Sequence, residues 1–369
     1  MTPAIVTQAI FWTSAAVVLY VYIGYPMLLL VWSRLRPRPV YTHRDEPPVS
    51  VIIAVRDEAE PLERKIANLR SLDYPASHLQ IVVVSDGHHR ATAAVLRRNV
   101  GVVDAIYVRR GGKAQALNAG VEAARHDILV FADVRQRFDR QALHGLVAPL
   151  ADRTVGGVSG ELMLDVELGE GAADIGEGMG GYWRYEKWLR RQESAIGSTM
   201  GATGAIYALR RSLWRPLPAD TILDDVLAPM RAVLAASRVV FSSEALAFDP
   251  VAPSGVELRR KIRTLAGNYQ ILRLEPRLLN PFRNPVWIQY MSHKVGRLLV
   301  PYALMALLIA SALLATTSPL YALAFASQVL FYVLAAYGAW LSRRDRRLAA
   351  DTGDREPAVN ALIKGTTTS

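Results

Sequence analysis

The sequence contains no cysteine. This absence excludes disulfide bonds, thiolate metal sites and a cysteine nucleophile. No basic stripe with interleaved aromatic residues is found either, so the composition gives no support for nucleic acid as a partner. With 369 residues, the chain is long enough for one large or two ordinary domains.

Long uncharged runs lie near both ends of the chain. The first extends from Ala9 to Trp32, and at about 1.5 Å per residue it can cross a hydrocarbon core of about 30 Å. The second, from Leu298 to Leu341, is long enough for two spans, with a turn expected at Thr316–Pro319. The sequence therefore predicts three transmembrane helices.

The basic residues that flank these runs predict the topology. No Lys or Arg precedes the first run, whereas Arg34, Arg36 and Arg38 follow it, and basic residues also flank the second run on its outer sides. The positive-inside rule then predicts an inner-membrane, multi-pass protein with its N-terminus outside and its central segment in the cytoplasm. A cleaved signal peptide is the alternative, but such a signal carries its charge in front. Much of the net charge of +10 is explained by this topology, because basic residues beside membrane spans are attracted to anionic lipid.

The expected domain boundaries follow from these runs. We expect an N-terminal transmembrane anchor at 1–33, a catalytic domain at 34–279, a membrane-interface segment at 280–297, two transmembrane helices at 298–341, and a mostly disordered cytoplasmic tail at 342–369.

The central segment alternates between apolar strand patterns and helical patterns. Strands are predicted at Val49–Val55, Leu79–Gly87, Ala105–Val108, Asp127–Asp133 and Gly156–Asp165, and helices at Glu60–Leu72, Thr92–Asn99, Ala114–Ala124 and Val226–Ala236. Continuous β-branched runs are typical of strands that are covered on both faces. This alternation favours an α/β domain with a mixed, mostly parallel, Rossmann-like sheet.

Polar residues follow the carboxyl ends of the predicted strands, where ligands bind in such sheets. Arg56, Asp57 and Glu58 follow the first strand, Asp86 ends the second, and Asp133 ends the fourth. Each carboxylate alone could be a helix cap or a turn residue. Their convergence on one edge predicts a binding site.

Seven segments, taken in order, resemble one known family. They are VSVIIAVRDEAEPL, VVVSDG, GGKAQALNAG, VFAD, GATGAIYALRR, TILDDVLAP and LRRKIRTLAGNYQ. The region from about Pro47 to Arg297 resembles the family 2 glycosyltransferases, the inverting GT-A group that includes the cellulose and hyaluronan synthases. The resemblance implies a GT-A fold and transfer of a sugar from a nucleotide-sugar donor, a UDP-sugar above all.

The resemblance also implies roles for individual residues. Asp225 would be the general base, with Asp224 as the other candidate. The donor side would comprise Arg56, Glu58, Asp86, Lys113, Asp133, Arg135, Arg260 and Arg263, and the acceptor side Gly201, Gly204 and Trp183. Asp133 would bind a divalent metal, Mg²⁺ or Mn²⁺. From the sequence alone, Asp225 could instead be the N-cap of the helix predicted to start at Val226.

Two residues depart from the family pattern. Arg135 stands where a second carboxylate is usual, and Thr264 stands where a tryptophan is usual. The threonine weakens the case for a processive polymerase. Arg135 has two interpretations: it supplies positive charge to the donor diphosphate and weakens the metal requirement, or it faces solvent or a nearby acid.

We therefore expect a membrane-anchored glycosyltransferase that acts on a hydroxyl acceptor, a carbohydrate or a lipid, in polysaccharide or glycolipid synthesis, alone or in an oligomer or synthase complex. Two alternatives stay open: transfer to a polyprenyl phosphate, or a catalytically silent nucleotide-binding partner. The aromatic and basic helix after Gly176 is either an interfacial amphipathic helix or a helix packed on the sheet, its glycines are a candidate hinge, and His293 is expected to be structural.

Overall fold

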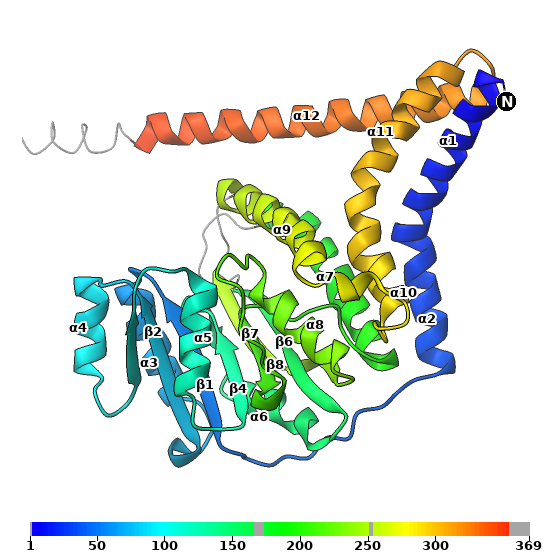
Figure 1. Ribbon diagram of the computed structural model, residues 1–369. Helices are drawn as coiled ribbons and strands as arrows, with labels where there is room; N and C mark the ends of the chain where they lie inside the picture. Colours follow the sequence, from blue (N-terminus) through cyan, green and yellow to red (C-terminus); the bar gives the residue numbers. More distant parts are fainter. Residues whose placement is uncertain (1, 166–172, 251–253, 354–369) are drawn as a thin grey trace, which may run out of the picture. The chain divides into compact units, whose positions relative to one another are not determined.

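The computed structural model describes residues 2–165, 173–250 and 254–353, and Figure 1 traces them in chain order. The chain forms two compact units. One comprises Tyr20–Leu298 and contains the sheet, and the other combines the residues up to Leu19 with those from Leu299 onward.

The elements of the described residues are as follows. The strands are β1 (Val49–Val55), β2 (Leu79–Asp86), β3 (Asp104–Val108), β4 (Ile128–Ala132), β5 (Arg137–Phe138), β6 (Val155–Asp165), β7 (Ile206–Arg210) and β8 (Arg238–Pro250). The helices are α1 (Pro3–Leu19), α2 (Tyr25–Leu35), α3 (Ala59–Arg70), α4 (Arg90–Arg98), α5 (Lys113–Ala123), α6 (Ala142–Val147), α7 (Ala173–Ile196), α8 (Asp224–Leu234), α9 (Ser254–Leu274), α10 (Trp287–Tyr290), α11 (Gly296–Leu314) and α12 (Pro319–Gly353).

In the described residues the strands form one eight-stranded sheet with the order β3-β2-β1-β4-β7-β6-β8-β5. The strands β3, β2, β1 and β4 are mutually parallel. Beyond β4 the sheet is mixed, because β7 runs antiparallel to β4 and β6, while β6 and β8 are parallel. This confirms the mixed sheet with a parallel half that the alternation of strands and helices predicted.

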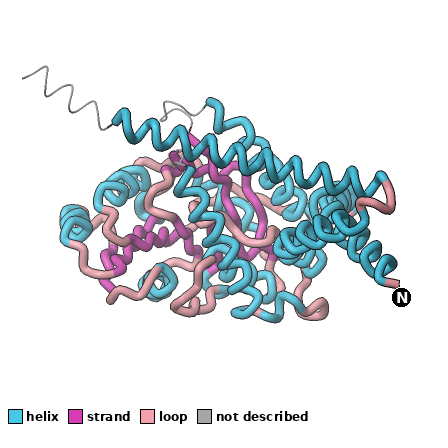
Figure 2. The backbone as a smooth tube through the Cα atoms, turned by 90° about the horizontal axis from the view of Figure 1, so that it is seen from above, coloured by secondary structure: helices cyan, strands magenta, loops and turns pink. Residues whose placement is uncertain are grey.

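Helices cover both faces of this sheet, and Figure 2 shows them on both sides of the strands. Alternate residues of β1 enter different cores: Val51 and Ile53 face one core with α3, α4 and α6, while Ile52 faces the other with α5 and α8. Burial on both faces explains why the sequence of β1 is apolar throughout rather than alternating.

Three helices are long and apolar enough to cross a membrane: Pro3–Leu35, Trp287–Leu314 and Pro319–Leu341. The first is interrupted by a π-helical turn at Tyr20–Gly24. Beyond that turn, Tyr25 and Leu29 of α2 are buried against Leu189 and Ile196 of α7. Residues 20–33 of the predicted anchor therefore belong to the unit that contains the sheet.

Two segments differ from the expected loops and tail. The glycine-rich stretch Gly176–Gly181 lies inside α7, so it is helical rather than a separate hinge loop. Helix α12 continues past its apolar part to Gly353, so the first part of the tail expected to be disordered is helical. Residues 354–369 lie outside the described residues.

Two helical glycines predict opposite effects of substitution by alanine: Gly145 of α6 is packed against the sheet, whereas Gly181 of α7 has open space beside it. A Cβ at Gly145 would lie 2.5 Å from the backbone nitrogen of Ala245, whereas a Cβ at Gly181 would meet nothing within 4 Å. We expect Gly145→Ala to lower stability by about 1–3 kcal/mol through overpacking. Gly181→Ala is expected to raise stability by roughly 1 kcal/mol, since alanine is the better helix former. Thermal unfolding in detergent measures both, and an unchanged midpoint for Gly145→Ala would contradict the packing.

Candidate active site

The carboxyl ends of β1, β2 and β4 meet at one edge of the sheet and carry the predicted polar residues. Glu58 follows β1, Asp86 is the last residue of β2, and Asp133 follows β4. These strands are adjacent and parallel, so their ends coincide in space. The first two residues of α8, Asp224 and Asp225, lie in the same region, because Asp224 contacts Lys113 and Asp225 contacts Gly204.

Lys113 links two of these carboxylates. Its Nζ donates a hydrogen bond to Oδ1 of Asp133 at 2.9 Å and lies 3.2 Å from Oδ2 of Asp224. Burial acts to lower the pKa of Lys113, but Asp224, Asp133 and Asp225 together raise it above the ordinary value. The ammonium therefore stays charged and holds together carboxylates from two distant parts of the chain.

Asp225 is held in place by backbone groups. The N–H of Gly204 donates to Oδ2 of Asp225 at 3.0 Å, and the N–H of Ala202 donates to the Asp225 carbonyl at 2.7 Å. Gly201 makes this loop possible because its φ of 124° is open to glycine but not to residues with a side chain. The loop that contains both predicted acceptor-side glycines, Gly201 and Gly204, therefore contacts the predicted base directly.

The environment of Asp225 suits a group that takes up a proton near neutral pH. Burial is the main cause that raises its pKa, to about 6; the neighbouring Asp224 and Asp133 add to the rise, whereas Lys113 and Lys294 oppose it. A general base works best when its pKa lies near the working pH.

The N-cap alternative for Asp225 is excluded by the geometry of α8. The helix starts at Asp224, its N-cap residue is Leu223, and no side chain makes a capping hydrogen bond. Asp225 lies inside the first turn, with its carboxylate directed to the Gly204 loop. Both carboxylates lie in the first turn of α8, where the positive end of the helix dipole stabilises negative charge.

Asp86 organises the loop that precedes Lys113. Its Oδ1 accepts hydrogen bonds from the backbone N–H groups of Gly111 at 2.7 Å and Gly112 at 3.2 Å. Gly112 has a φ of 88°, which only glycine adopts readily. Asp86, predicted on the donor side, is therefore bound to the glycine loop and is only 4% exposed.

Arg135 is exposed, and its charge acts on a carboxylate of the first loop. Burial raises the pKa of Glu58, and the positive charge of Arg135 and the backbone N–H of Arg56 oppose this rise. Both interpretations of Arg135 remain predictions, because its side chain is open to solvent as well as near an acid. Arg56 itself is exposed.

Asp57, in the loop after β1, has a φ of 52°. Asp and Asn tolerate this left-handed region better than other residues with a side chain. Its carboxylate lies 3.7 Å from Nδ1 of His89, which follows the loop after β2. The loops after β1 and β2 are thereby paired with each other.

The predicted diphosphate-binding arginines lie on α9. Arg263 donates to the carbonyl of Ile222 at 3.3 Å, and Arg260 lies 3.7 Å from Asp249 at the end of β8. Arg263 thus reaches the segment that leads into Asp224, whereas Arg260 is bound to a buried acid. Trp183 is half-buried on α7, and in the described residues no hydrogen bond joins it to the carboxylates.

Three residues that the sequence analysis did not assign also support the site. Tyr207 on β7 is 1% exposed, and its hydroxyl has no hydrogen-bond partner among the described residues. Burial, followed by Asp224, Asp225 and Asp133, raises its pKa well above the ordinary value. Its hydroxyl is therefore a neutral group close to three carboxylates, and only its place within the GATGAIYALRR segment could have indicated it.

The other two residues hold the loop before α8. The Asn118 amide exchanges two hydrogen bonds, each of 2.9 Å, with the backbone N–H and carbonyl of Leu217. The Gln270 side chain accepts from the N–H of Ile222 at 2.9 Å and donates to the carbonyl of Asp220 at 2.8 Å. Both contacts join segments far apart in sequence, which explains why local patterns did not reveal them.

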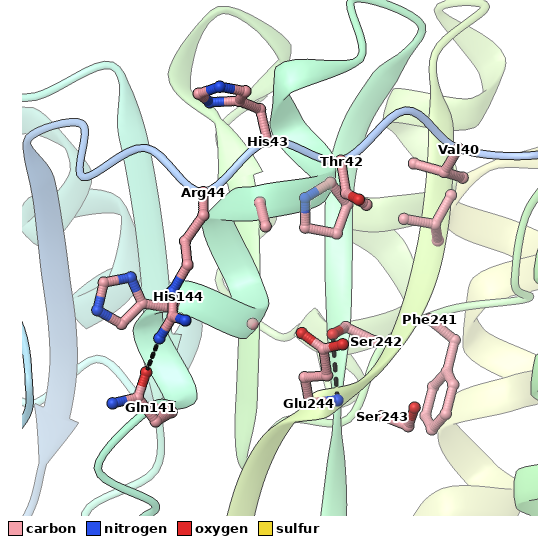
Figure 3. A pocket seen from close by; sticks show the side chains of 14 residues that line it. Val40, Thr42, His43, Arg44, Gln141, His144, Phe241, Ser242, Ser243 and Glu244 are labelled. Carbon is pink, nitrogen blue, oxygen red and sulfur yellow. Dashed lines mark hydrogen bonds between the residues drawn. The ribbon is translucent and has the colours of Figure 1, made fainter.

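A cavity of about 580 Å³ lies elsewhere in the unit, and its lining includes Arg44, Gln141, His144 and Glu244 (Figure 3). None of the predicted site residues lines it. The cavity and the carboxylate cluster are therefore separate features.

The residues of the cluster fit a hard divalent cation. Lys113 occupies one oxygen of Asp133, and the other oxygen, Oδ2, lies toward Gly204 and Asp225. Among the described residues no group of three His, Cys, Asp or Glu side chains forms a complete metal site. Mg²⁺ commonly binds through one or two carboxylates plus substrate phosphates and waters. One carboxylate with a free oxygen is sufficient for that mode.

Part of the chain matches a glycosyltransferase family model, and the chain is similar to proteins described as a glycosyltransferase and a polysaccharide synthase. Residues 50–212 match the family model described as Glycosyl transferase family 2. Glycosyltransferase AglE of Haloferax volcanii is 26% identical over 253 residues, covering 66% of this chain and 80% of that protein. The poly-beta-1,6-N-acetyl-D-glucosamine synthase of Staphylococcus aureus is 21% identical over 243 residues, or 61% of this chain. The match spans 55% of that synthase's length.

A solved structure has the same fold. The mannosyltransferase PcManGT from Pyrobaculum calidifontis, in complex with GDP-Man and Mn²⁺, superimposes with a TM-score of 0.69 at 22% identity. The superposition covers 90% of this chain and 94% of that one. The fold is therefore the GT-A fold, as expected from the sequence. The family 2 match over residues 50–212 and the similarity to known glycosyltransferases together support a glycosyltransferase enzyme.

Proposed function

We propose that this protein is an inverting glycosyltransferase that transfers a sugar from a nucleotide-sugar donor, a UDP-sugar, to a hydroxyl group of a carbohydrate or lipid acceptor. The observation that carries the proposal is the arrangement of Asp225. It is a buried carboxylate held by the Gly204 N–H, with a pKa raised to about 6, beside the charged pair of Lys113 and Asp133.

The donor would lie at the carboxyl edge of the parallel strands. Its diphosphate would approach Lys113 and Asp133, where the helix α5 begins directly after two glycines. A helix N-terminus and an ammonium both favour phosphate. Arg263 on α9 and Arg135 would add positive charge as the diphosphate leaves, and Asp86 would keep the glycine loop in place for the nucleotide.

Inversion requires a base on the face of the sugar opposite the leaving group. Asp225 would accept the proton of the acceptor hydroxyl while that oxygen forms a bond to C1 and the bond from C1 to the diphosphate breaks. The proton ends on Asp225 and the electron pair of the broken bond on the diphosphate. A positioned base of this kind contributes about 10²–10⁴-fold to the rate.

Asp133 would hold a divalent cation together with the donor phosphates. When bound, such a cation stabilises the negative charge of the leaving diphosphate. Lys113 would keep the carboxylate of Asp133 oriented, and Asp224 would keep Lys113 in place through their 3.2 Å ion pair.

The three apolar helices support a membrane location. We propose that they span an inner membrane, with the N-terminus outside and the sheet-containing unit in the cytoplasm. The basic flanks at Arg34, Arg36 and Arg38 and at Arg343 and Arg344 support this orientation.

A donor screen on purified protein in lipid tests the activity. We expect release of UDP from a UDP-sugar in the presence of a sugar or lipid acceptor, loss of release in EDTA, and recovery with Mn²⁺ or Mg²⁺. Undiminished release in EDTA would contradict the metal assignment to Asp133 and would favour Arg135 and Lys113 as the source of charge. No release from any nucleotide sugar would overturn the enzyme proposal and leave a silent nucleotide-binding partner.

The raised pKa of Asp225 predicts a pH dependence. Below about pH 6 Asp225 is protonated and cannot accept a proton, so kcat/KM should fall about tenfold per pH unit on the acid side. Asp225→Asn should lower kcat by about 10²–10⁴-fold and abolish this acid limb, whereas Asp224→Asn should retain it. Full activity of Asp225→Asn would rule out the base and would point to a phosphate acceptor, which needs little deprotonation.

The topology has an independent test. A reporter fused after Arg347 should be active only in its cytoplasmic form, because Arg347 follows the third apolar helix on its basic side. A reporter fused before Pro3 should report the opposite compartment. Periplasmic activity of the fusion at Arg347 would refute the three-span arrangement.

A further inference from the structure

Helix α3 contains a buried lysine that the catalytic scheme above does not use. Lys65 is 2% exposed, and burying an ammonium is costly unless it is compensated. Within the described ion pairs no carboxylate lies within 4 Å of it. Its Nζ instead donates to the carbonyl of Gln136 at 2.8 Å and lies 3.4 Å from the centroid of the Phe138 ring.

A second residue of α3 holds the same segment. Asn68 lies three positions after Lys65 and so on the same face of the helix. Its Nδ2 donates to the carbonyl of Phe138 at 3.0 Å, and its Oδ1 accepts from the Phe138 N–H at 2.7 Å. Together the two side chains bind residues 136–138 through three hydrogen bonds and one cation–π contact. We call this set of contacts the α3 clamp.

The clamped residues directly follow the donor-site residues. Asp133 and Arg135 lie in the short turn between the end of β4 at Ala132 and the clamp at Gln136. Strand β4 fixes one end of the turn in the sheet, and the α3 clamp fixes the other end. Neither Asp133 nor Arg135 is itself bonded to α3 by any contact given for the described residues.

The charge of Lys65 also acts on the turn. Burial lowers the pKa of Lys65 to about 7, and Asp133 is the charge that acts in the opposite direction. Asp133 is therefore close enough to stabilise the ammonium. A neutral side chain of similar length, such as methionine, would pack without this interaction and without the hydrogen bond to Gln136.

We propose that Lys65 is a positioning residue of the donor site: with Asn68 it fixes the turn that carries Asp133 and Arg135, so that both side chains meet the donor diphosphate. This role rests on the proposed function, because it acts through donor binding. In this role Lys65 acts through residues 136–138, which it contacts, and not on the donor or acceptor directly.

Steady-state kinetics of the full-length protein in lipid would test the role, with Lys65→Met as the variant and Arg64→Ala as its matched control. Arg64 is the exposed neighbour on α3, and within the described part of the chain its only ion-pair partner is Glu60. We expect Lys65→Met to raise the KM for the donor or the concentration of Mn²⁺ needed for half-maximal rate about tenfold, the scale of residues that support a site from behind. kcat should change less, Arg64→Ala should match the wild type, and Lys65→Arg should recover part of the loss.

Hydrogen exchange provides a readout that does not depend on turnover. Lys65→Met should speed exchange in residues 133–138 while β1 and β2 stay protected as in the wild type. Wild-type kinetics together with wild-type exchange would overturn the proposal. If Lys65→Met does not fold, Asn68→Ala, which removes two hydrogen bonds of the clamp and keeps the ammonium, should speed exchange in the same residues; unchanged exchange would overturn it.

The two proposals fail in different ways. If the wild-type protein releases no UDP from any donor, the proposed function fails, and the exchange experiment still tests whether the α3 clamp holds the turn. If the wild type is active and Lys65→Met equals Arg64→Ala in both KM and exchange, only the role of Lys65 fails.

Discussion

The ammonium group of Lys113 is the contact on which the rest of the site depends. It contacts Asp133, which follows strand β4 of the parallel half of the sheet, and Asp224, which begins helix α8 much later in the sequence. Without a cation there, three carboxylates would repel each other in a poorly hydrated region, since like charges in low dielectric interact strongly. One positive charge thus holds together acids that come from the sheet edge and from the start of α8.

The sheet topology makes this convergence possible. The parallel strands β1, β2 and β4 end at the same edge, and the first antiparallel neighbour, β7, begins there and brings the Gly201–Gly204 loop with it. The loop then meets the backbone and the carboxylate of Asp225. The change from parallel to antiparallel pairing therefore lies where the proposed donor side and the proposed acceptor side adjoin.

Much of the parallel half could be predicted from the sequence because burial on both faces leaves a direct pattern. The run Val49–Val55 coincides with β1, and Leu62, Ile66 and Leu69 of α3 enter one core as their spacing predicted. The convergence of Asp86 and Asp133 at the strand ends followed from the same pattern. These features depend on local periodicity and on a general rule of parallel sheets.

Other features were beyond the sequence because they depend on contacts between distant segments. The hydrogen bond from Gly204 to Asp225, the grip of Asn118 on Leu217 and the α3 clamp all join residues that no local pattern relates. Lys65 did leave a trace, since it lies between Leu62 and Leu69 on the apolar face of α3, where a lysine is unusual. Helix α7 shows the opposite effect: glycines favour a loop locally, and the surrounding fold still holds them in a helix.

The packing of α2 against α7 gives the N-terminal apolar segment a structural role in the unit that contains the sheet. Tyr25 and Leu29 are buried, and the Tyr25 hydroxyl donates to Glu193, which also contacts His293 within the second apolar helix. A shortened protein that starts after residue 33 would therefore lose a wall of its own domain, exposing Leu189 and Ile196 and leaving a buried glutamate with one partner fewer. The segment is a proposed membrane anchor and also a structural part of the unit that contains the sheet, so that unit cannot be separated cleanly at the edge of its most hydrophobic stretch.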